Sequence, residues 1–279
     1  MMVRDLMQSP VKVINRVDTL SHARKTMMKE HLSRLIVVEG TKPVGTLTRR
    51  DIVRGINDYR MRQRELDTIV VDEVMRSPVS TTTETESVAD AARKMVSQNV
   101  RGLPVVDLAG ELIGIVTKTD LTRYFSENFT GKLKVGDICQ NKENTPIIHP
   151  TQSVSRAMDL MQDCSTDRVV VVDGEKPVGI ITETDLSNIR THSGGGSFVK
   201  GSVRDSEAVS QTRIYIKPTA EDIMTKTLQV VASTKDAAQA ARMLISREIG
   251  GMPVVSREGN LVGMVTKFDF VKVIAKEEK

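Results

Sequence analysis

Tryptophan is absent from the 279-residue sequence, and aromatic residues make up only 3% of it. Proteins that bind single-stranded nucleic acids stack bases on aromatic side chains, so few positions for such stacking exist here. Cysteine is also scarce: Cys139 and Cys164 fit no metal-binding or disulfide pattern. Cys139 occupies a position where other repeats of the chain have methionine, which predicts a small buried hydrophobic residue.

Several sequence features of membrane proteins and enzymes are missing as well. The sequence contains no run of about 18 apolar residues, so no transmembrane helix is predicted. The N-terminal residues lack an apolar signal core. We therefore expect a cytoplasmic protein without a membrane partner. No phosphate loop of the Gly-x-x-x-x-Gly-Lys type occurs, and the four histidines lie in dissimilar contexts. We therefore expect neither an enzyme nor a metal site, and no bound cofactor.

The charge is nearly balanced, with a formal net charge of +4 and an isoelectric point near 9.0. The basic clusters are short and interrupted by acidic residues, which argues against nucleic acid as a partner but leaves it as an alternative.

One motif recurs four times: glycine, two strand-forming residues, threonine, two variable residues and aspartate. The threonines and aspartates of the four copies are Thr48 and Asp51, Thr117 and Asp120, Thr182 and Asp185, and Thr266 and Asp269. Repeats at such spacing predict a repeat architecture.

Three other patterns recur at fixed positions relative to the motif. Each repeat has an opening helical turn with an acidic residue, an amphipathic helix whose apolar residues step by three and then four, and a β-branched run before the motif strand. An extended lead-in precedes each amphipathic helix, and a second helix carries the motif aspartate. The predicted class is therefore α/β (α+β), with each repeat reading helix, strand, strand, helix.

The predicted boundaries follow from this register. Repeat one covers 1–66, repeat two 67–131, repeat three 132–191 and repeat four 219–279, with an insertion at 192–218. A unit of about 60 residues is marginal alone, so repeats one and two, and repeats three and four, are expected to pair. A charged helix is predicted from Ile52 to Leu66, a flexible stretch from Ser193 to Ser197, and a strand from Arg213 to Ile216.

Spacing alone leaves two interpretations of the threonine–aspartate motif open. Threonine followed three residues later by an acid is a capping pattern at a helix start. The same geometry places a hydroxyl and free N–H groups where phosphate binds, with a carboxylate one turn on that can accept from ribose hydroxyls.

The four motifs, each behind a Leu/Met-Pro-Val-Val run or its variant, resemble cystathionine β-synthase (CBS) domains. Two such domains form a Bateman module, and four in one chain resemble the nucleotide-sensing gamma subunit of AMP-activated protein kinase and its archaeal stand-alone relatives. The resemblance implies two modules in a disc with approximate internal symmetry, as a monomer or a homodimer. It also implies AMP, ADP or ATP as ligands.

The resemblance further implies roles for particular residues. The aspartates Asp51, Asp120, Asp185 and Asp269 would bind ribose, and Thr48, Thr117, Thr182 and Thr266 would meet phosphate. The basic residues expected at phosphate are Arg34, Arg101 and Arg168, whose alternative is a solvated strand edge; repeat four has Gly250 and Gly251 instead. The residues expected beside adenine are Val13, Thr81, Ile147 and Val230, which without the resemblance would be ordinary core.

The leading hypothesis is a regulatory adenine-nucleotide sensor that changes conformation and acts on a protein partner, such as an enzyme that it regulates. The alternatives are a nucleic-acid-binding protein, an S-adenosylmethionine-binding regulatory protein of the same family, and a structural scaffold whose motifs only cap helices.

Overall fold

The computed structural model describes residues 1–57, 61, 63–187, 190–191, 198–199 and 218–277. The chain divides into two compact units, Met1–Phe125 with Phe270–Lys279 (unit 1) and Ser126–Asp269 (unit 2). The predicted flexible stretch at 193–197 and the predicted strand at 213–216 lie outside the described residues. No helix in the described part of the chain has the length and apolar character needed to cross a membrane.

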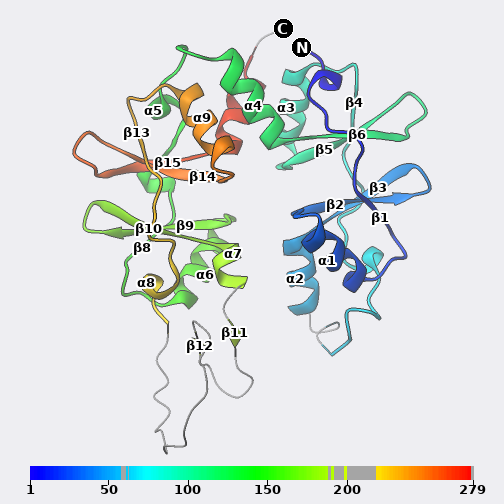
Figure 1. Ribbon diagram of the computed structural model, residues 1–279, viewed down its shortest axis with the longest axis horizontal. Coiled ribbons are helices and arrows are strands. Elements are labelled where there is room, and N and C mark those ends of the chain that lie inside the picture. Colours follow the sequence, from blue (N-terminus) through cyan, green and yellow to red (C-terminus); the bar gives the residue numbers. More distant parts are fainter. Residues whose placement is uncertain (58–60, 62, 188–189, 192–197, 200–217, 278–279) are drawn as a thin grey trace, which may run out of the picture. The chain divides into compact units, whose positions relative to one another are not determined.

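Unit 1 holds most of repeats one and two, and unit 2 holds repeats three and four up to Asp269, while the rest of the last helix belongs to unit 1. The four repeats share one order of elements (Figure 1). The elements of repeat one are η1 (Val3–Asp5), β1 (Val13–Asn15), α1 (Leu20–Lys29), β2 (Arg34–Glu39), β3 (Lys42–Thr48) and α2 (Arg49–Asn57). Those of repeat two are η2 (Val71–Glu73), β4 (Thr82–Thr83), α3 (Val88–Ser97), β5 (Gly102–Val106), β6 (Leu112–Thr117) and α4 (Lys118–Asn128).

Repeats three and four follow the same plan with short additions. Repeat three comprises α5 (Val135–Ile138), β7 (Gln140–Asn141), η3 (Lys142–Asn144), β8 (Ile147–Ile148), α6 (Val154–Asp163), β9 (Arg168–Asp173), β10 (Lys176–Thr182) and α7 (Glu183–Ser187), followed by the strand pair β11 (Arg190–Thr191) and β12 (Phe198–Val199). Repeat four comprises α8 (Ala220–Ile223), β13 (Val231–Ala232), α9 (Ala237–Ser246), β14 (Gly251–Val255), β15 (Leu261–Thr266) and α10 (Lys267–Ala275).

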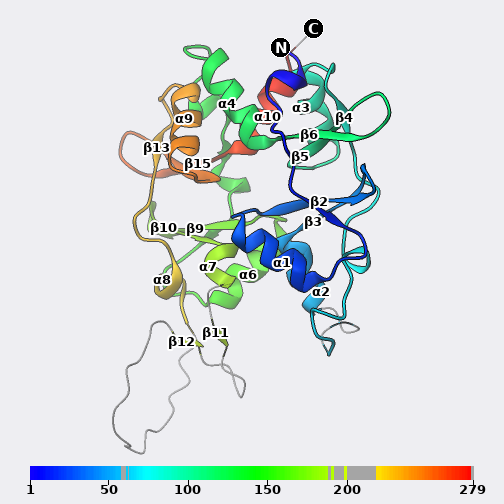
Figure 2. The ribbon, with the colours of Figure 1, turned by 45° about the vertical axis from the view of Figure 1, so that its right-hand side comes forward.

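Every repeat builds one small mixed sheet. The lead-in strand pairs in parallel with the β-branched strand, which forms an antiparallel hairpin with the motif strand. In each unit the two sheets lie over one another with the helices on their outer sides (Figures 1 and 2). In unit 2 the residues between the sheets include buried Val170, Val172, Leu261 and Met264. The predicted fold class and the pairing of neighbouring repeats are confirmed.

The amphipathic helices start at polar caps, as their sequences predict. The side chains of Thr19, Ser87, Ser153 and Asp236 accept hydrogen bonds from backbone N–H groups three residues further on, which satisfies one of the orphan donors of each helix. The predicted apolar stripe is buried in all four helices.

The predicted charged helix from Ile52 to Leu66 is wrong in its extent, because α2 ends at Asn57. Gly55 and Asn57 are weak helix formers, which favours an end there. Residue 61 and residues 63–66 are turns or irregular, and Arg64 forms an ion pair with Glu73 at 2.7 Å.

The opening turn of each repeat packs on the partner repeat rather than on its own. In unit 1, Val3 N donates to Glu86 O in repeat two, and Val71 N donates to Asp18 O in repeat one. In unit 2, Val135 N donates to Lys235 O in repeat four, and Ala220 N donates to Gln152 O in repeat three. The core of repeat one accordingly includes Ile69, Val71 and Val74 from the next repeat.

The packing of each opening turn on the partner repeat also explains why each motif starts with glycine. A Cβ on Gly45 would lie 2.6 Å from Met75 Sδ, and one on Gly114 would lie 2.7 Å from Met7 Sδ. The methionine that ends each opening turn therefore covers the glycine of the partner repeat. Repeat three has Cys139 at this position, and there the backbone of Gln140 approaches Gly263 instead.

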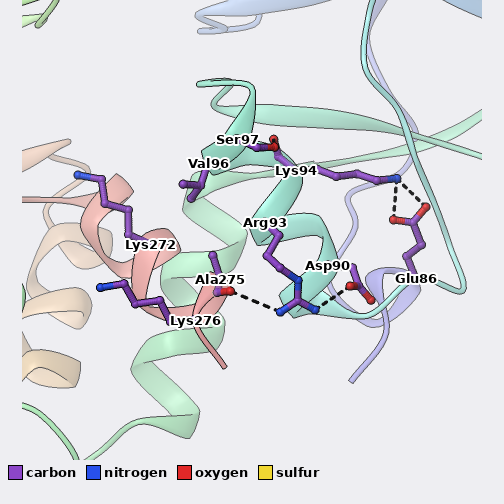
Figure 3. Close-up of a pocket in the computed structure, with 9 residues that line it drawn as sticks. All are labelled: Glu86, Asp90, Arg93, Lys94, Val96, Ser97, Lys272, Ala275 and Lys276. Atoms are coloured by element: carbon purple, nitrogen blue, oxygen red, sulfur yellow. Dashed lines mark hydrogen bonds and ion pairs between the residues drawn. The ribbon is translucent and has the colours of Figure 1, made fainter. Parts of the chain in front are cut away.

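The C-terminal segment completes unit 1. Phe270 and Phe125 are both fully buried, with ring centroids 4.8 Å apart. Arg93 of α3 donates to the carbonyl oxygens of Ala275 and Glu277 and forms an ion pair with Asp90 at 2.7 Å. Figure 3 shows the contacts of Arg93 with Ala275 and Asp90 beside an open hollow, whose lining includes Val96, Lys272 and Lys276. None of the residues that line it is a predicted ligand residue.

Candidate functional site

The motif threonine and aspartate adopt the same arrangement in all four repeats. The threonine amide nitrogens lie 3.0, 2.8, 2.7 and 2.8 Å from Oδ2 of Asp51, Asp120, Asp185 and Asp269, respectively. The threonine hydroxyl oxygens lie 2.5, 2.6, 2.6 and 2.7 Å from the same atoms. Each aspartate is the third residue of a helix whose first residue follows the threonine. The capping geometry is therefore present at every motif.

This geometry limits what each group can offer to a ligand. A hydroxyl has one proton, and the threonine hydroxyl donates it to aspartate Oδ2. To meet phosphate as a donor, the threonine would have to turn away from the carboxylate. The other carboxylate oxygen, Oδ1, is the natural acceptor for a ribose hydroxyl.

In unit 1 the Oδ1 atoms are contacted by residues from the partner repeat. Arg76 of repeat two donates to Asp51 Oδ1 at 2.8 Å, and Gln8 of repeat one donates to Asp120 Oδ1 at 3.2 Å. Both residues follow the methionine of an opening turn. The sequence reasoning missed them, although their fixed place after the methionine was a usable signal.

The aspartates differ in burial. Asp51, Asp120 and Asp269 are buried, with exposed fractions of 0%, 5% and 2%, whereas Asp185 is half-buried. A buried carboxylate needs partners to offset its lost hydration, and the threonine bonds supply them. Among the residues that the structure describes, Oδ1 of Asp185 has no hydrogen-bond or ion-pair partner.

Arg34 lies at the junction of repeats one and two. Arg34 pairs with Thr48 across the β2–β3 hairpin. Its Nη1 atom lies 3.0 Å from the position that a Cβ atom on Gly102 would occupy. Its guanidinium makes no hydrogen bond or ion pair with any described residue. Burial lowers its pKa to about 10, assisted by the nearby charges of Arg101 and Arg76 and opposed by that of Asp51.

The structure therefore brings together three of the predicted site residues of unit 1, Asp51, Arg34 and Arg101, with Arg76 as a fourth member. Arginine groups close to one another repel unless an anion lies between them, and a guanidinium fork fits phosphate oxygens. This arrangement is typical of an anion-binding site.

Arg168 of unit 2 has a different environment. It is buried, so it is not a solvated strand edge, and its Nε donates to Asp167 at 2.8 Å. Its guanidinium lies against Gly250 and Gly251, where a Cβ would be 2.5 and 2.9 Å from its nearest nitrogen atoms. The two glycines of repeat four thus make room for the arginine of repeat three.

Two of the lead-in residues predicted beside adenine are not ordinary core, since Val13 and Val230 are 43% and 39% exposed. Thr81 and Ile147 are half-buried, and Ile147 packs against the core cluster between the sheets of unit 2. Exposed valines beside a sheet junction offer apolar surface that a base could cover.

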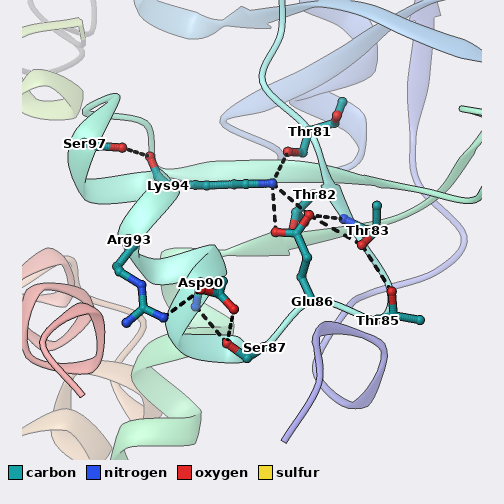
Figure 4. A network of polar contacts seen from close by, with 10 residues as sticks. All are labelled: Thr81, Thr82, Thr83, Thr85, Glu86, Ser87, Asp90, Arg93, Lys94 and Ser97. Carbon is teal, nitrogen blue, oxygen red and sulfur yellow. Dashed lines mark hydrogen bonds and ion pairs between the residues drawn. The ribbon is translucent and has the colours of Figure 1, made fainter. Parts of the chain in front are cut away.

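A polar network fixes the lead-in of repeat two (Figure 4). Lys94 Nζ donates to Thr81 O at 3.3 Å and to Glu86 at 2.8 Å, and Thr82 Oγ1 donates to Glu86 at 3.0 Å. Burial raises the pKa of Glu86, but these bonds and that of the Thr83 N–H outweigh it and lower the pKa below its ordinary value.

Cys139 lies near the motif of repeat four. It is half-buried rather than buried as predicted, and its pKa is raised by burial and by the charge of Asp269. No group of three or more His, Cys, Asp or Glu side chains that could hold a metal occurs within the described part of the chain.

Comparison with known proteins adds a family match. The model of the CBS domain matches residues 3–58, 71–127, 135–191 and 220–276. The chain is 24% identical to the uncharacterized protein MJ1225 of Methanocaldococcus jannaschii over 270 residues, 92% of each chain. It is 31% identical to MJ1404 of the same organism over 192 residues, which are 68% of this chain but only 44% of that protein.

Two solved structures share the fold over almost the whole chain. The crystal structure of MJ1225, described as a proposed archaeal homolog of g-AMPK, has a TM-score of 0.77 and 21% identity, and covers 99% of this chain and 100% of that one. A conserved protein from Pyrococcus horikoshii has a TM-score of 0.69 and 22% identity, and covers 98% and 100%.

Proposed function

Because the chain belongs to the CBS domain family, with four copies of the domain, we propose that it is a regulatory protein that binds adenine nucleotides between paired repeats. The observation that carries this proposal is the Arg34 guanidinium, which has no partner among the described residues and lies with Arg101 and Arg76 beside the Asp51 motif. A phosphate group would supply the missing counter-charge, while the motif carboxylate would accept from ribose.

The binding of a nucleotide acts on a partner only if the ligand favours one conformation over another. The reciprocal packing of the opening turns provides a physical route. A ligand held by the aspartate of one repeat and the arginine of the other changes how tightly the two repeats close. The regulated partner would be a protein that contacts the unit in one of these states.

Isothermal titration calorimetry of the full chain with AMP, ADP and ATP tests the proposal. We expect binding of at least one nucleotide, with the stoichiometry reduced when motif aspartates are replaced by asparagine. S-adenosylmethionine serves as a comparison ligand, since its sulfonium group carries positive charge and would not gain from Arg34. If none of the three nucleotides gives heat or thermal stabilisation, the proposal fails.

A further inference from the structure

The two units present different charges at structurally equivalent positions. The backbone oxygen of Arg101 accepts from Lys118 N at 3.1 Å, and that of Gly250 accepts from Lys267 N at 3.1 Å, so Arg101 and Gly250 are equivalent. Unit 1 therefore has a guanidinium where unit 2 has only a hydrogen atom.

The same comparison applies on the opposite side of the site. Arg76 forms a backbone bridge with Thr46, and Thr225 forms the corresponding bridge with Ile180. Unit 1 again has a guanidinium where unit 2 has a neutral side chain.

The arginine that both units share is also used differently. Arg34 follows Ser33, and its guanidinium has no partner among the described residues. Arg168 follows Asp167, and part of its charge is already neutralised by that carboxylate at 2.8 Å. The unit 2 site thus has one arginine, which is paired with an acid, whereas the unit 1 site has three arginines, of which Arg76 pairs with Asp51.

We propose that the two units bind ligands of different charge: unit 1 takes an adenine nucleotide with two or three phosphate groups, and unit 2 takes a nucleoside or nucleoside monophosphate. The inference rests on the proposed nucleotide-binding function and specifies its ligand class for each site. Each added phosphate gains from a guanidinium only where one lies within reach, and hydrogen bonds between charged groups are the strong ones.

The test uses the full-length chain and the ligands ATP, AMP and adenosine, with Arg101→Gly as the central variant because glycine is what unit 2 has at this position. The loss of one charged hydrogen-bond donor lowers affinity roughly tenfold or more. We expect Arg101→Gly to weaken ATP binding by about this factor and to change adenosine binding by less than about threefold. The charge-retaining variant Arg101→Lys should lose less ATP affinity than Arg101→Gly, and thermal melts identify any variant that is poorly folded.

The sites are assigned with two double variants. The unit 1 variant, Asp51→Asn with Asp120→Asn, should lose tight ATP binding and keep adenosine binding. The unit 2 variant, Asp185→Asn with Asp269→Asn, should lose adenosine binding and keep tight ATP binding. The inference is overturned if Arg101→Gly binds ATP as tightly as the wild type, or if ATP binding is lost only in the unit 2 variant. Absence of binding for all three ligands would instead refute the proposed function itself.

Discussion

Replacement of Asp120 by asparagine separates the two roles of its carboxylate. Oδ2 accepts both hydrogen bonds from Thr117, at 2.8 and 2.6 Å, and an asparagine oxygen in the same place keeps both. The new NH₂ group then faces Gln8 Nε2, which lies 3.2 Å from Oδ1, and the Gln8 amide can turn to present its oxygen. Arg123 Nη1, 3.5 Å from the same oxygen, also loses its ion pair, but this side chain is 47% exposed and such surface pairs contribute little. We therefore expect a loss of unfolding free energy of at most about 1 kcal/mol, whereas Asp120→Ala, which removes the acceptor, should cost about 1–3 kcal/mol.

Ligand binding should respond differently from stability. The ribose hydroxyls are donors toward Oδ1, and the asparagine NH₂ group cannot accept them. The expected loss is roughly tenfold or more in affinity at that site, from a hydrogen bond to a charged group.

Asp51→Asn is the matched variant in repeat one. Its NH₂ group would face Arg76 Nε, which lies 2.8 Å from Oδ1 and has no acceptor to offer. We expect Asp51→Asn to be less stable than Asp120→Asn by about 1 kcal/mol, since one donor is left without its bond.

Urea denaturation and calorimetric stoichiometry on the same preparations measure both quantities. An Asp120→Asn protein that binds nucleotide with wild-type affinity and stoichiometry would refute the ligand role of this carboxylate. An Asp120→Ala protein as stable as Asp120→Asn would refute the reasoning about the cap.

Three further predictions concern stability. Arg34→Met should raise the melting temperature of the ligand-free protein, because the folded pKa of Arg34, about 10, lies below its unfolded pKa. Such a base destabilises the fold below pH 10 and does so less as the pH rises above 10 towards the unfolded pKa. A lower melting temperature at pH 7 would contradict this. Phe270→Ala should cost about 3–5 kcal/mol in urea denaturation through loss of the buried contact with Phe125, and Phe270→Leu, as control, less than about 1.5 kcal/mol. Gly114→Ala should cost about 1–3 kcal/mol because its Cβ meets Met7, and the added change Met7→Ala should restore part of the loss; purely additive losses would exclude this contact as the cause.

Local patterns in the sequence predicted most of the fold. The stripe of Leu20, Ala23 and Met27 fixed the buried face of α1, and the β-branched run from Leu35 to Val38 predicted a buried strand. These signals depend on neighbours three or four residues away, or on alternate residues of a strand, so they are visible in the chain itself. The prediction that a helix extends to Leu66 was wrong because a charged stretch with helical composition can also form turns held by ion pairs such as Arg64–Glu73.

The finer features of the site depend on contacts between distant residues. Sequence spacing predicted Thr117 and Asp120 as neighbours, but it could not show that Gln8 would approach the same carboxylate, since 112 residues separate the two. The difference between Arg34 and Arg168 also arises from packing. Both precede a β-branched run, yet Arg34 has no partner in the part of the chain that the structure describes, whereas Arg168 is held by the adjacent Asp167.

The membership of Phe270 in unit 1 has a consequence for synthesis of the protein on the ribosome. The sheets and opening turns of unit 1 are complete once repeat two has emerged, but Phe125 lacks its ring partner until nearly the whole chain has been translated. During that interval a large apolar side chain of the nascent chain remains without its final cover. Premature termination anywhere in unit 2 would therefore leave a product in which Phe125 lacks its ring partner, and exposed apolar surface of this kind favours aggregation and degradation.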